Sequence, residues 1–139
     1  MTMKLFPISM LLFLAVAITS CQSHSKSIGS GAPAKVLLKP ADFQTQISRT
    51  KKAVLLDVRT PEEFAEGHLD GALNIDVKNP DFAEQIRQLD TSKTYFVYCR
   101  SGRRSITACD TLLSSGFVKL YELDGGILSW QESGKPVVK

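Results

Sequence analysis

Residues 94–105 (TYFVYCRSGRRS) decide the fold that we predict for this chain, because they join an apolar strand to a helix through a short polar loop. The apolar run over residues 94–98 predicts the strand. A helical pattern follows, starting at residue 101 or 102 and ending at residue 115. Cys99, three arginines and one glycine lie where the strand gives way to the helix.

The same alternation of strand and helix continues on both sides of this stretch. Further strands are predicted over residues 36–38, 53–58, 72–75 and 119–123. Further helices are predicted to begin at Pro40, after the helix cap Thr60, after Pro80 and Asp81, and after Gly125 and Gly126. This order predicts an α/β fold, with one domain whose mainly parallel central sheet carries helices on both faces. Ligands on such sheets bind beyond the carboxyl ends of the strands, near a topological switch point, and Cys99 lies at such an end.

The composition is that of an ordinary globular domain. The chain has 139 residues and a formal net charge of +3, which is too small to indicate nucleic-acid binding. No spacing of Cys and His residues indicates a metal site, and we expect no cofactor. Cys109 lies on the apolar face of the helix that follows Cys99, so we predict that it is a small core residue.

The N-terminal residues predict export. Residues 1–20 combine Lys4 with an apolar run that is too short for a transmembrane helix and fits a secretory signal. The stretch that ends in Cys21 (ITSC) resembles a bacterial lipobox, which implies cleavage before Cys21 and lipidation of its sulfur. Residues 21–34 would form a flexible tether and residues 35–139 the domain. We expect a periplasmic or cell-surface protein whose lipid is its only membrane contact; the alternatives are an ordinary signal peptide with an incidental cysteine, or an uncleaved anchor.

The loop after Cys99 has the features of a reactive-cysteine site. Unpaired N–H groups at a helix N-terminus carry partial positive charge, which favours the nucleophilic thiolate. The same groups, with Arg100, Arg103 and Arg104, can hold an oxyanion beside the sulfur. These features predict sulfur chemistry on a small anion, and they require a sulfur that solvent can reach. The alternative is a solvated basic loop beside a buried, inert cysteine.

Four motifs in sequence order resemble those of the rhodanese-like domain family, over about residues 35–137. They are residues 55–64 (LLDVRTPEEF), residues 67–75 (GHLDGALNI), residues 99–105 (CRSGRRS), and residues 123–126 (LDGG) with Trp130. The resemblance implies that Cys99 takes a sulfane sulfur from a small anionic donor such as thiosulfate, becomes a persulfide, and passes the sulfur to a thiol or to cyanide. Chemically this is a double displacement through a covalent intermediate. We expect a monomer without a cofactor.

The resemblance, together with the residues themselves, indicates roles for the residues around this cysteine. The residues that would hold the donor oxyanion, and then the outer sulfur of the persulfide, are Arg100, Ser101, Gly102, Arg103, Arg104 and Ser105. Which arginine faces the substrate stays open. Asp57 and Arg59 either support the site or form a structural ion pair, and the structural role is the expected one. His68 is structural in the family, and Phe64 and Trp130 are expected to cover the core.

Three other functions remain open. Phosphatases and arsenate reductases of related fold have a loop of cysteine, five residues and arginine, but this chain has Ser105 where that arginine would stand. A persulfide carrier or binding module that serves one acceptor protein would use the same Cys99. A redox role is the third, because an exposed thiolate oxidises readily and an exported protein meets an oxidising compartment.

Overall fold

The computed structural model describes residues 34–139. The predicted signal segment, Cys21 and the tether up to residue 33 lie outside the described residues. The elements in chain order are β1 (Ala34–Leu38), α1 (Pro40–Arg49), β2 (Ala53–Asp57), α2 (Pro61–Glu66), β3 (Leu73–Asn74), α3 (Phe82–Arg87), β4 (Thr94–Tyr98), α4 (Arg103–Ser114), β5 (Lys119–Leu123) and α5 (Gly126–Glu132). None of these helices is long and apolar enough to cross a membrane.

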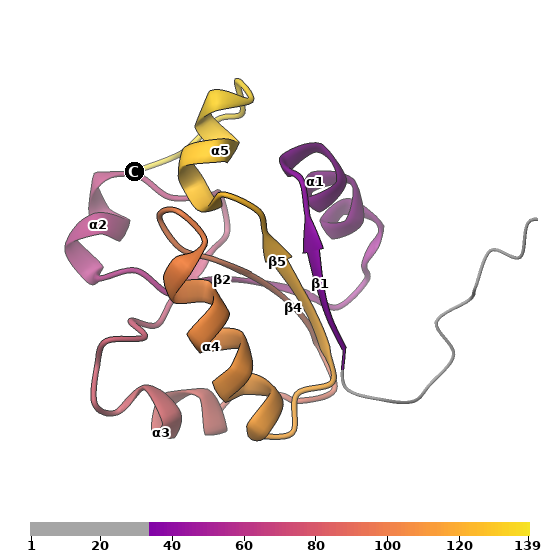
Figure 1. Cartoon of the computed structure of the whole chain (residues 1–139), viewed down its shortest axis with the longest axis vertical. Helices are drawn as coiled ribbons and strands as arrows, with labels where there is room; N and C mark the ends of the chain where they lie inside the picture. The colour runs from indigo at the N-terminus through magenta and orange to yellow at the C-terminus, as the bar shows by residue number, and fades with distance from the viewer. Residues whose placement is uncertain (1–33) are drawn as a thin grey trace, which may run out of the picture.

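The strands pair in parallel in the order β1-β5-β4-β2-β3. The strands β1, β5 and β4 lie side by side in Figure 1. The central strand β4 lies between β5 and β2. The chain runs from β4 to β5 on one side, whereas it runs from β2 to β3 on the other. The carboxyl ends of β2 and β4 therefore flank the topological switch point, where open α/β sheets bind their ligands. The prediction of a parallel α/β sheet is confirmed.

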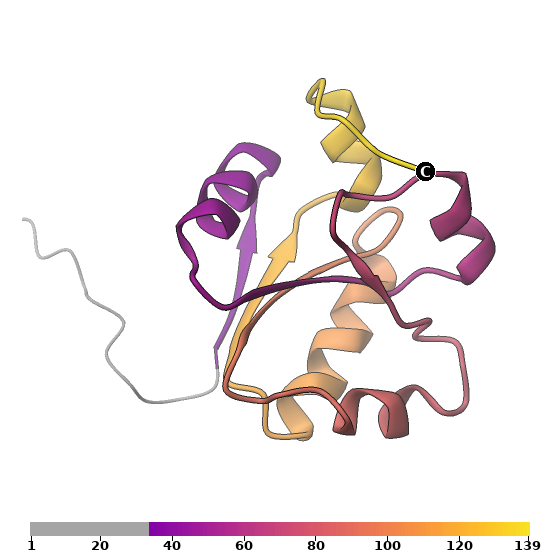
Figure 2. The same ribbon diagram turned by 180° about the vertical axis from the view of Figure 1, so that it is seen from behind.

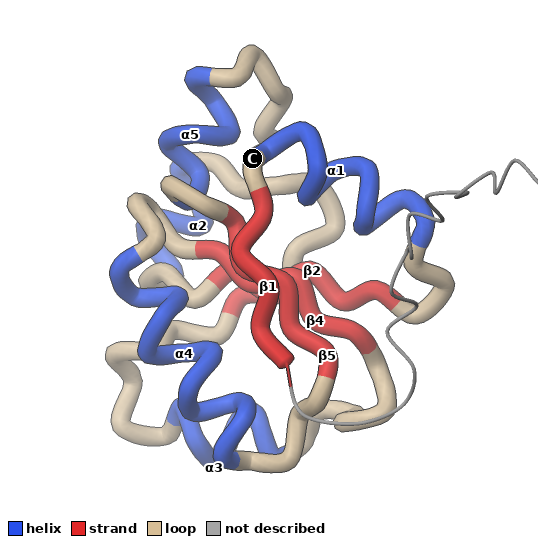
Figure 3. The backbone as a smooth tube through the Cα atoms, turned by 45° about the vertical axis from the view of Figure 1, so that its right-hand side comes forward, coloured by secondary structure: helices blue, strands red, loops and turns tan. Residues whose placement is uncertain are grey.

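Helices cover both faces of this sheet (Figure 3). One core cluster joins α3 and α4 to the sheet, through residues such as Ile86 and Leu112. The other joins α1 and α5 to the opposite face. Because β4 is buried on both faces, its side chains alternate between the clusters: Val97 belongs to the first and Tyr98 to the second. This explains the continuous apolar run, and the same alternation turns Cys99 toward the face that α4 covers.

Local sequence signals set the ends of several elements. The Thr60 side chain accepts the backbone N–H of Glu63, and the Glu63 carboxylate accepts the backbone N–H of Thr60, so the predicted helix start is a complete capping box. The edge strand β3 is shorter than predicted, because it pairs with β2 over two residues only. β1 begins at Ala34, the last residue of the predicted tether.

The C-terminal segment returns from α5 to the neighbourhood of α2 (Figure 2). There His68 and Val138 form an antiparallel bridge, with N–H···O distances of 2.8 and 2.9 Å. This bridge ties the segment after α5 to the turn after α2. Both segments lie at the end of the sheet where Cys99 is placed.

Candidate active site

Cys99 follows β4 directly and lies one residue beyond the strand. The loop from Arg100 to Gly102 leads from it into α4. Gly102 is the residue before the helix, and its φ of +93° lies in the left-handed region that favours glycine. The predicted placement of the cysteine between a strand end and a helix N-terminus is confirmed.

Helix α5 fixes the backbone of this loop. The N–H of Ile127 donates to the carbonyl of Cys99 at 2.9 Å, and the N–H of Leu128 donates to the carbonyl of Arg100 at 3.1 Å. The carbonyl and the N–H of a trans peptide point in opposite directions. The N–H groups of Arg100 and Ser101 therefore point away from α5. The next N–H along the loop, that of Gly102, donates to the Sγ of Cys99 at 3.2 Å.

Gly126 makes this close approach between α5 and the loop possible. A Cβ atom at this position would lie 2.4 Å from the carbonyl oxygen of Cys99 and 2.6 Å from that of Arg100. Its φ is +60°, so a side chain would also strain the backbone. The Gly-Gly pair was recognised in the sequence as a closing motif, but its contact with the loop follows only from the structure.

The side chain of Cys99 is less accessible than the sequence predicts. The residue is only 1% exposed and belongs to the core cluster beneath α4. The strand alternation turns it inward, and the loop backbone covers it. The requirement for a solvent-accessible sulfur is therefore not met in this conformation. The burial fits the alternative of a core cysteine, whereas the N–H of Gly102 on the sulfur fits the reactive one.

Two buried polar side chains continue inward from the sulfur. The thiol of Cys99 lies 3.7 Å from the Oγ of Ser105, and that hydroxyl lies 2.6 Å from a carboxylate oxygen of Glu122. Ser105 is fully buried and Glu122 is 2% exposed. The other carboxylate oxygen of Glu122 is 3.6 Å from the Nζ of Lys35 on β1. Glu122 is a site residue that the sequence did not predict; the signal for it was a charged residue between the apolar side chains of Tyr121 and Leu123 in β5.

The three loop arginines have different surroundings. Arg104 is bound by Glu63, with two N–H···O distances of 2.6 and 2.7 Å. This pair lowers the pKa of the Glu63 carboxyl to about 2, chiefly through the hydrogen bonds from Arg104. Among residues 34–139, neither Arg100 nor Arg103 has an ion-pair partner. Arg104 is thus the arginine least free to meet a substrate.

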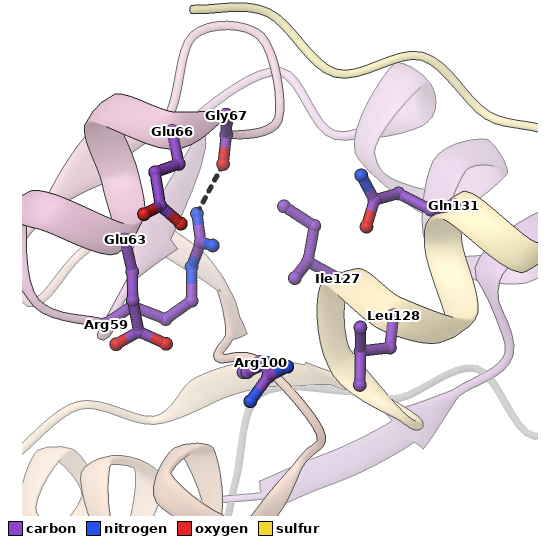
Figure 4. A pocket seen from close by; sticks show the side chains of 8 residues that line it. All are labelled: Arg59, Glu63, Glu66, Gly67, Arg100, Ile127, Leu128 and Gln131. Atoms are coloured by element: carbon purple, nitrogen blue, oxygen red, sulfur yellow. Dashed lines mark hydrogen bonds between the residues drawn. The ribbon is translucent and has the colours of Figure 1, made fainter.

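Arg100 lines a cleft of about 490 Å³ between α2 and α5 (Figure 4). Arg59, two residues beyond β2, and Glu66, from α2, face the same space, and Gln131 of α5 lies opposite them. The cleft thus lies above the switch point between β2 and β4. Arg103 lines a second cavity of about 380 Å³ on the other side of the loop, together with Lys35 and Glu122.

Asp57 and Arg59 make the contacts of a structural ion pair. The Arg59 guanidinium donates to both carboxylate oxygens of Asp57 and also to the carbonyl of Gly67, at 2.7 Å. Its Nε and Nη2 atoms lie 3.0 and 2.6 Å from the Oδ2 of Asp57. Asp57 is completely buried and Arg59 is 5% exposed. The pair therefore braces the end of β2 against the turn after α2. Arg59 borders the cleft, but its guanidinium already donates hydrogen bonds to Asp57 and to Gly67.

The remaining side chains behave as structural residues. The Nδ1 of His68 lies 3.0 Å from the carbonyl of Phe64, and the two rings stack with their centroids 3.7 Å apart. These are the contacts of a structural residue and not those of a base for Cys99. Trp130 is buried and donates its Nε1–H to the carbonyl of Pro136. Cys109 is fully buried, as predicted, and burial with the nearby Glu122 carboxylate raises its thiol pKa to about 12.

Metal-ligating side chains are not gathered in the described part of the chain. No group of three or more His, Cys, Asp and Glu residues in it is placed to hold a metal ion. The chemistry that the loop can offer rests on one sulfur, backbone N–H groups and two unpaired guanidinium groups.

Comparisons with known proteins agree with this arrangement. A family model described as rhodanese-like domain matches residues 39–133. The chain is 43% identical over 91 residues to thiosulfate sulfurtransferase 16, chloroplastic, of Arabidopsis thaliana, which covers 58% of this chain and 76% of that protein. It is 35% identical over 95 residues to a sulfurtransferase of Allochromatium vinosum, covering 67% and 85% of the two chains.

A solved structure shows the same fold. The rhodanese-related protein from Thermoplasma volcanium matches with a TM-score of 0.65 and 34% identity, covering 74% of this chain and 97% of that one. The family match spans every element from α1 to α5, including the loop after Cys99. The chain belongs to the rhodanese-like domain family.

Proposed function

We propose that this protein is a sulfurtransferase that carries a sulfane sulfur as a persulfide on Cys99. The observation that carries the proposal is the backbone hydrogen bond from Gly102 to the Sγ of Cys99, at the switch point of the sheet. An N–H donor aimed at a sulfur stabilises negative charge on it. Relatives named thiosulfate sulfurtransferase and sulfurtransferase support the same class of reaction.

The reaction would proceed in two displacements. The Cys99 thiolate attacks the sulfane sulfur of thiosulfate, a new S–S bond forms, and the S–S bond of thiosulfate breaks, so that sulfite leaves with the bonding electron pair. The acceptor, cyanide or a thiolate, then attacks the outer sulfur of the persulfide. The bond to Cys99 breaks, the sulfur leaves on the acceptor, and the Cys99 thiolate is regenerated.

The cleft beside the loop would receive the donor. Arg100 is exposed there, and its guanidinium has no ion-pair partner among the described residues, so it can bind a sulfonate end by charge-assisted hydrogen bonds. Arg103 is the second candidate, on the far side of the loop. Arg104, held by Glu63, would position the start of α4 instead.

Transfer requires a movement of the loop, because Cys99 is 1% exposed. Only Arg100, Ser101 and Gly102 separate Cys99 from α4, and the first two are exposed. A displacement of this segment would open the sulfur to the cleft without disturbing the sheet. We propose that the donor anion stabilises the open loop through the guanidinium of Arg100 and the N–H groups of Arg100 and Ser101.

The same persulfide could serve turnover or carriage to one acceptor protein. A phosphatase would need an arginine at position 105, where this chain has a buried serine. We further propose that the protein is exported and anchored to a bacterial membrane by a lipid on Cys21, which places its donor and acceptor outside the cytoplasm.

The test is a mass measurement on the full chain after treatment with thiosulfate. Trypsin cleavage after Lys93 and Arg100 yields a peptide of residues 94–100 that contains Cys99, and cleavage after Arg104 and Lys119 yields one with Cys109. We expect one added sulfur on the first peptide, a gain of about 32 Da by the mass of sulfur, and none on the second. Sulfur on both peptides, or on neither, would contradict the proposal. Phosphate release from p-nitrophenyl phosphate without sulfur transfer would favour the phosphatase instead.

A further inference from the structure

The hydroxyl of Ser105 has one proton and three candidate acceptors. Glu122 offers a carboxylate oxygen at 2.6 Å, Gly102 a carbonyl oxygen at 2.9 Å, and Cys99 its sulfur at 3.7 Å. A hydrogen bond to a charged acceptor is shorter and about twice as strong as a neutral one. Ser105 therefore donates to Glu122, and its oxygen is left as an acceptor toward Cys99.

The direction of the hydrogen bond from Ser105 to Glu122 determines which atom of Ser105 faces the inner side of the Cys99 sulfur. The thiol proton has an acceptor there, the Oγ of Ser105, whereas a thiolate would face that oxygen's lone pairs. On the outer side, the N–H of Gly102 donates to the same sulfur. The sulfur thus lies between one contact that favours the thiol and one that favours the thiolate.

We propose that Glu122, acting through Ser105, is a positioning residue that keeps the sulfur of Cys99 as an oriented, protonated thiol in the resting protein. Ionisation then requires the Ser105 hydroxyl to turn its proton from Glu122 to the sulfur, while the thiol proton leaves to water. Lys35, 3.6 Å from the carboxylate, remains to balance the charge of Glu122 when it does so. The thiolate forms once the Ser105 hydroxyl has turned, with the N–H of Gly102 on the outer side of the sulfur, and until then the resting sulfur is protected from oxidation.

Other charged groups near Glu122 do not reverse this effect. The neighbouring ionisable side chains come from β1, α4 and the end of β5: Lys35, Arg103, Asp110, Asp124 and the thiol of Cys109. Two cations and two further carboxylates offset each other, which leaves the charge of Glu122 itself. Near Cys99, the cation of Arg104 is already paired with Glu63.

The experiment measures the rate at which iodoacetamide alkylates Cys99 in the full chain as a function of pH. The peptide of residues 94–100 reports Cys99, and the peptide of residues 105–119 reports Cys109 in the same digest. For Glu122→Gln, which keeps the shape and removes the charge, we expect the midpoint of the Cys99 profile to move to lower pH. The rate at a fixed pH on the rising limb should increase by about three- to tenfold.

Asp110→Asn is the matched control. Asp110 lies 3.5 Å from the same Lys35, but it is exposed and does not contact Ser105. We expect it to leave the Cys99 profile unchanged. In a Ser105→Ala background, the effect of Glu122→Gln should become much smaller, because the proposed contact is then missing.

Three results would overturn the proposal. A shift of the Glu122→Gln profile to higher pH would make Glu122 a base for the thiol. An unchanged profile would leave it without influence, and an equal shift in the Ser105→Ala background would show that its charge acts through space. Label on Cys109 would show that the Glu122→Gln variant has misfolded. In that case Glu122→Asp, whose shorter side chain ends farther from Ser105, should move the midpoint of the Cys99 profile to lower pH in the same way. The proposal rests on Cys99 as the reactive thiol, but alkylation needs no sulfur donor, so a failed transfer assay and a failed profile remain distinguishable.

Discussion

The described part of the chain, residues 34–139, contains two buried cysteines ten residues apart whose surroundings differ. Cys99 is 1% exposed and Cys109 is fully buried, so burial does not separate them. The sulfur of Cys99 receives a backbone N–H and lies beside a hydroxyl, at the end of a strand. Cys109 lies within α4, and burial with the nearby carboxylate of Glu122 raises its pKa to about 12.

Local polarity, rather than exposure, therefore separates Cys99, the cysteine that we propose to be reactive, from the core cysteine Cys109. A helix interior offers no free N–H group to a sulfur, because its N–H groups bind carbonyls one turn earlier. The loop before α4 leaves such groups free, and α5 holds the opposite ends of their peptides. Four measurements test this comparison.

The largest effect is expected from the cysteines themselves. Cys99→Ser should abolish sulfur transfer from thiosulfate to cyanide, because no persulfide can form on an oxygen. Cys109→Ser should keep most of the activity, since that sulfur only fills core volume. The measurement is thiocyanate release under identical conditions. Equal loss in both variants would remove the distinction between the two sites.

The second effect is the difference in thiol reactivity in the folded protein. With its pKa raised from the ordinary 9 to about 12, Cys109 should hold about a thousandfold less thiolate at neutral pH than an ordinary cysteine. We expect iodoacetamide to leave it unlabelled in the native state and to label it fully in urea. Native labelling of Cys109 at a rate similar to that of Cys99 would contradict the comparison.

The third effect concerns the contact between α5 and the loop. Gly126→Ala should destabilise the protein by about 2–4 kcal/mol and lower sulfur transfer, because its Cβ would meet the carbonyls of Cys99 and Arg100. Gly134→Ala is the matched control, with a similar φ of +71° and no atom within 4 Å of the added Cβ. It should cost about 1 kcal/mol and keep the activity. Urea unfolding and transfer assays measure both, and similar losses would show that only backbone strain matters.

The smallest effect is the pH dependence that Glu63 confers through Arg104. Its pKa falls from 4.5 in the unfolded chain to about 2 in the fold, so its stabilisation is present above pH 4.5 and is lost as the pH falls toward 2. Because the pair is partly exposed, we expect it to contribute about 1–2 kcal/mol. Glu63→Gln should flatten the dependence of unfolding free energy on pH in this range. Glu84, which pairs with Arg87 on the exposed surface, provides the control. Glu84→Gln should leave the pH dependence of the unfolding free energy nearly unaltered.

Much of the fold followed from patterns within single segments. The predicted bounds of β4 and β5 match those in the structure. For β4 the signal was a continuous apolar run, which marks a strand that is buried on both faces. The cap at Thr60 was equally clear, since a capping box involves residues only three apart. β3 was predicted too long because its length depends on its neighbour, not on its own residues.

Much less of the site followed in this way. The sequence identified Cys99 and its loop, but it left open which arginine was free and whether the sulfur was covered. Those answers depend on Glu63 and on Gly126, which lie 41 residues before Arg104 and 27 residues after Cys99 in the sequence. Glu122 reaches Ser105 because β5 pairs with β4 in a register that sets Val97 beside Glu122.

The sequence by itself therefore determined the order of strands and helices, the parallel sheet and the cysteine at its switch point, because periodicity and capping act over a few residues. Only the tertiary structure decided that the sulfur is buried, that Arg104 is occupied, and that a carboxylate from β5 stands behind Ser105. Those features arise where segments distant in the chain meet, and the register and packing that bring them together cannot be read from any one segment.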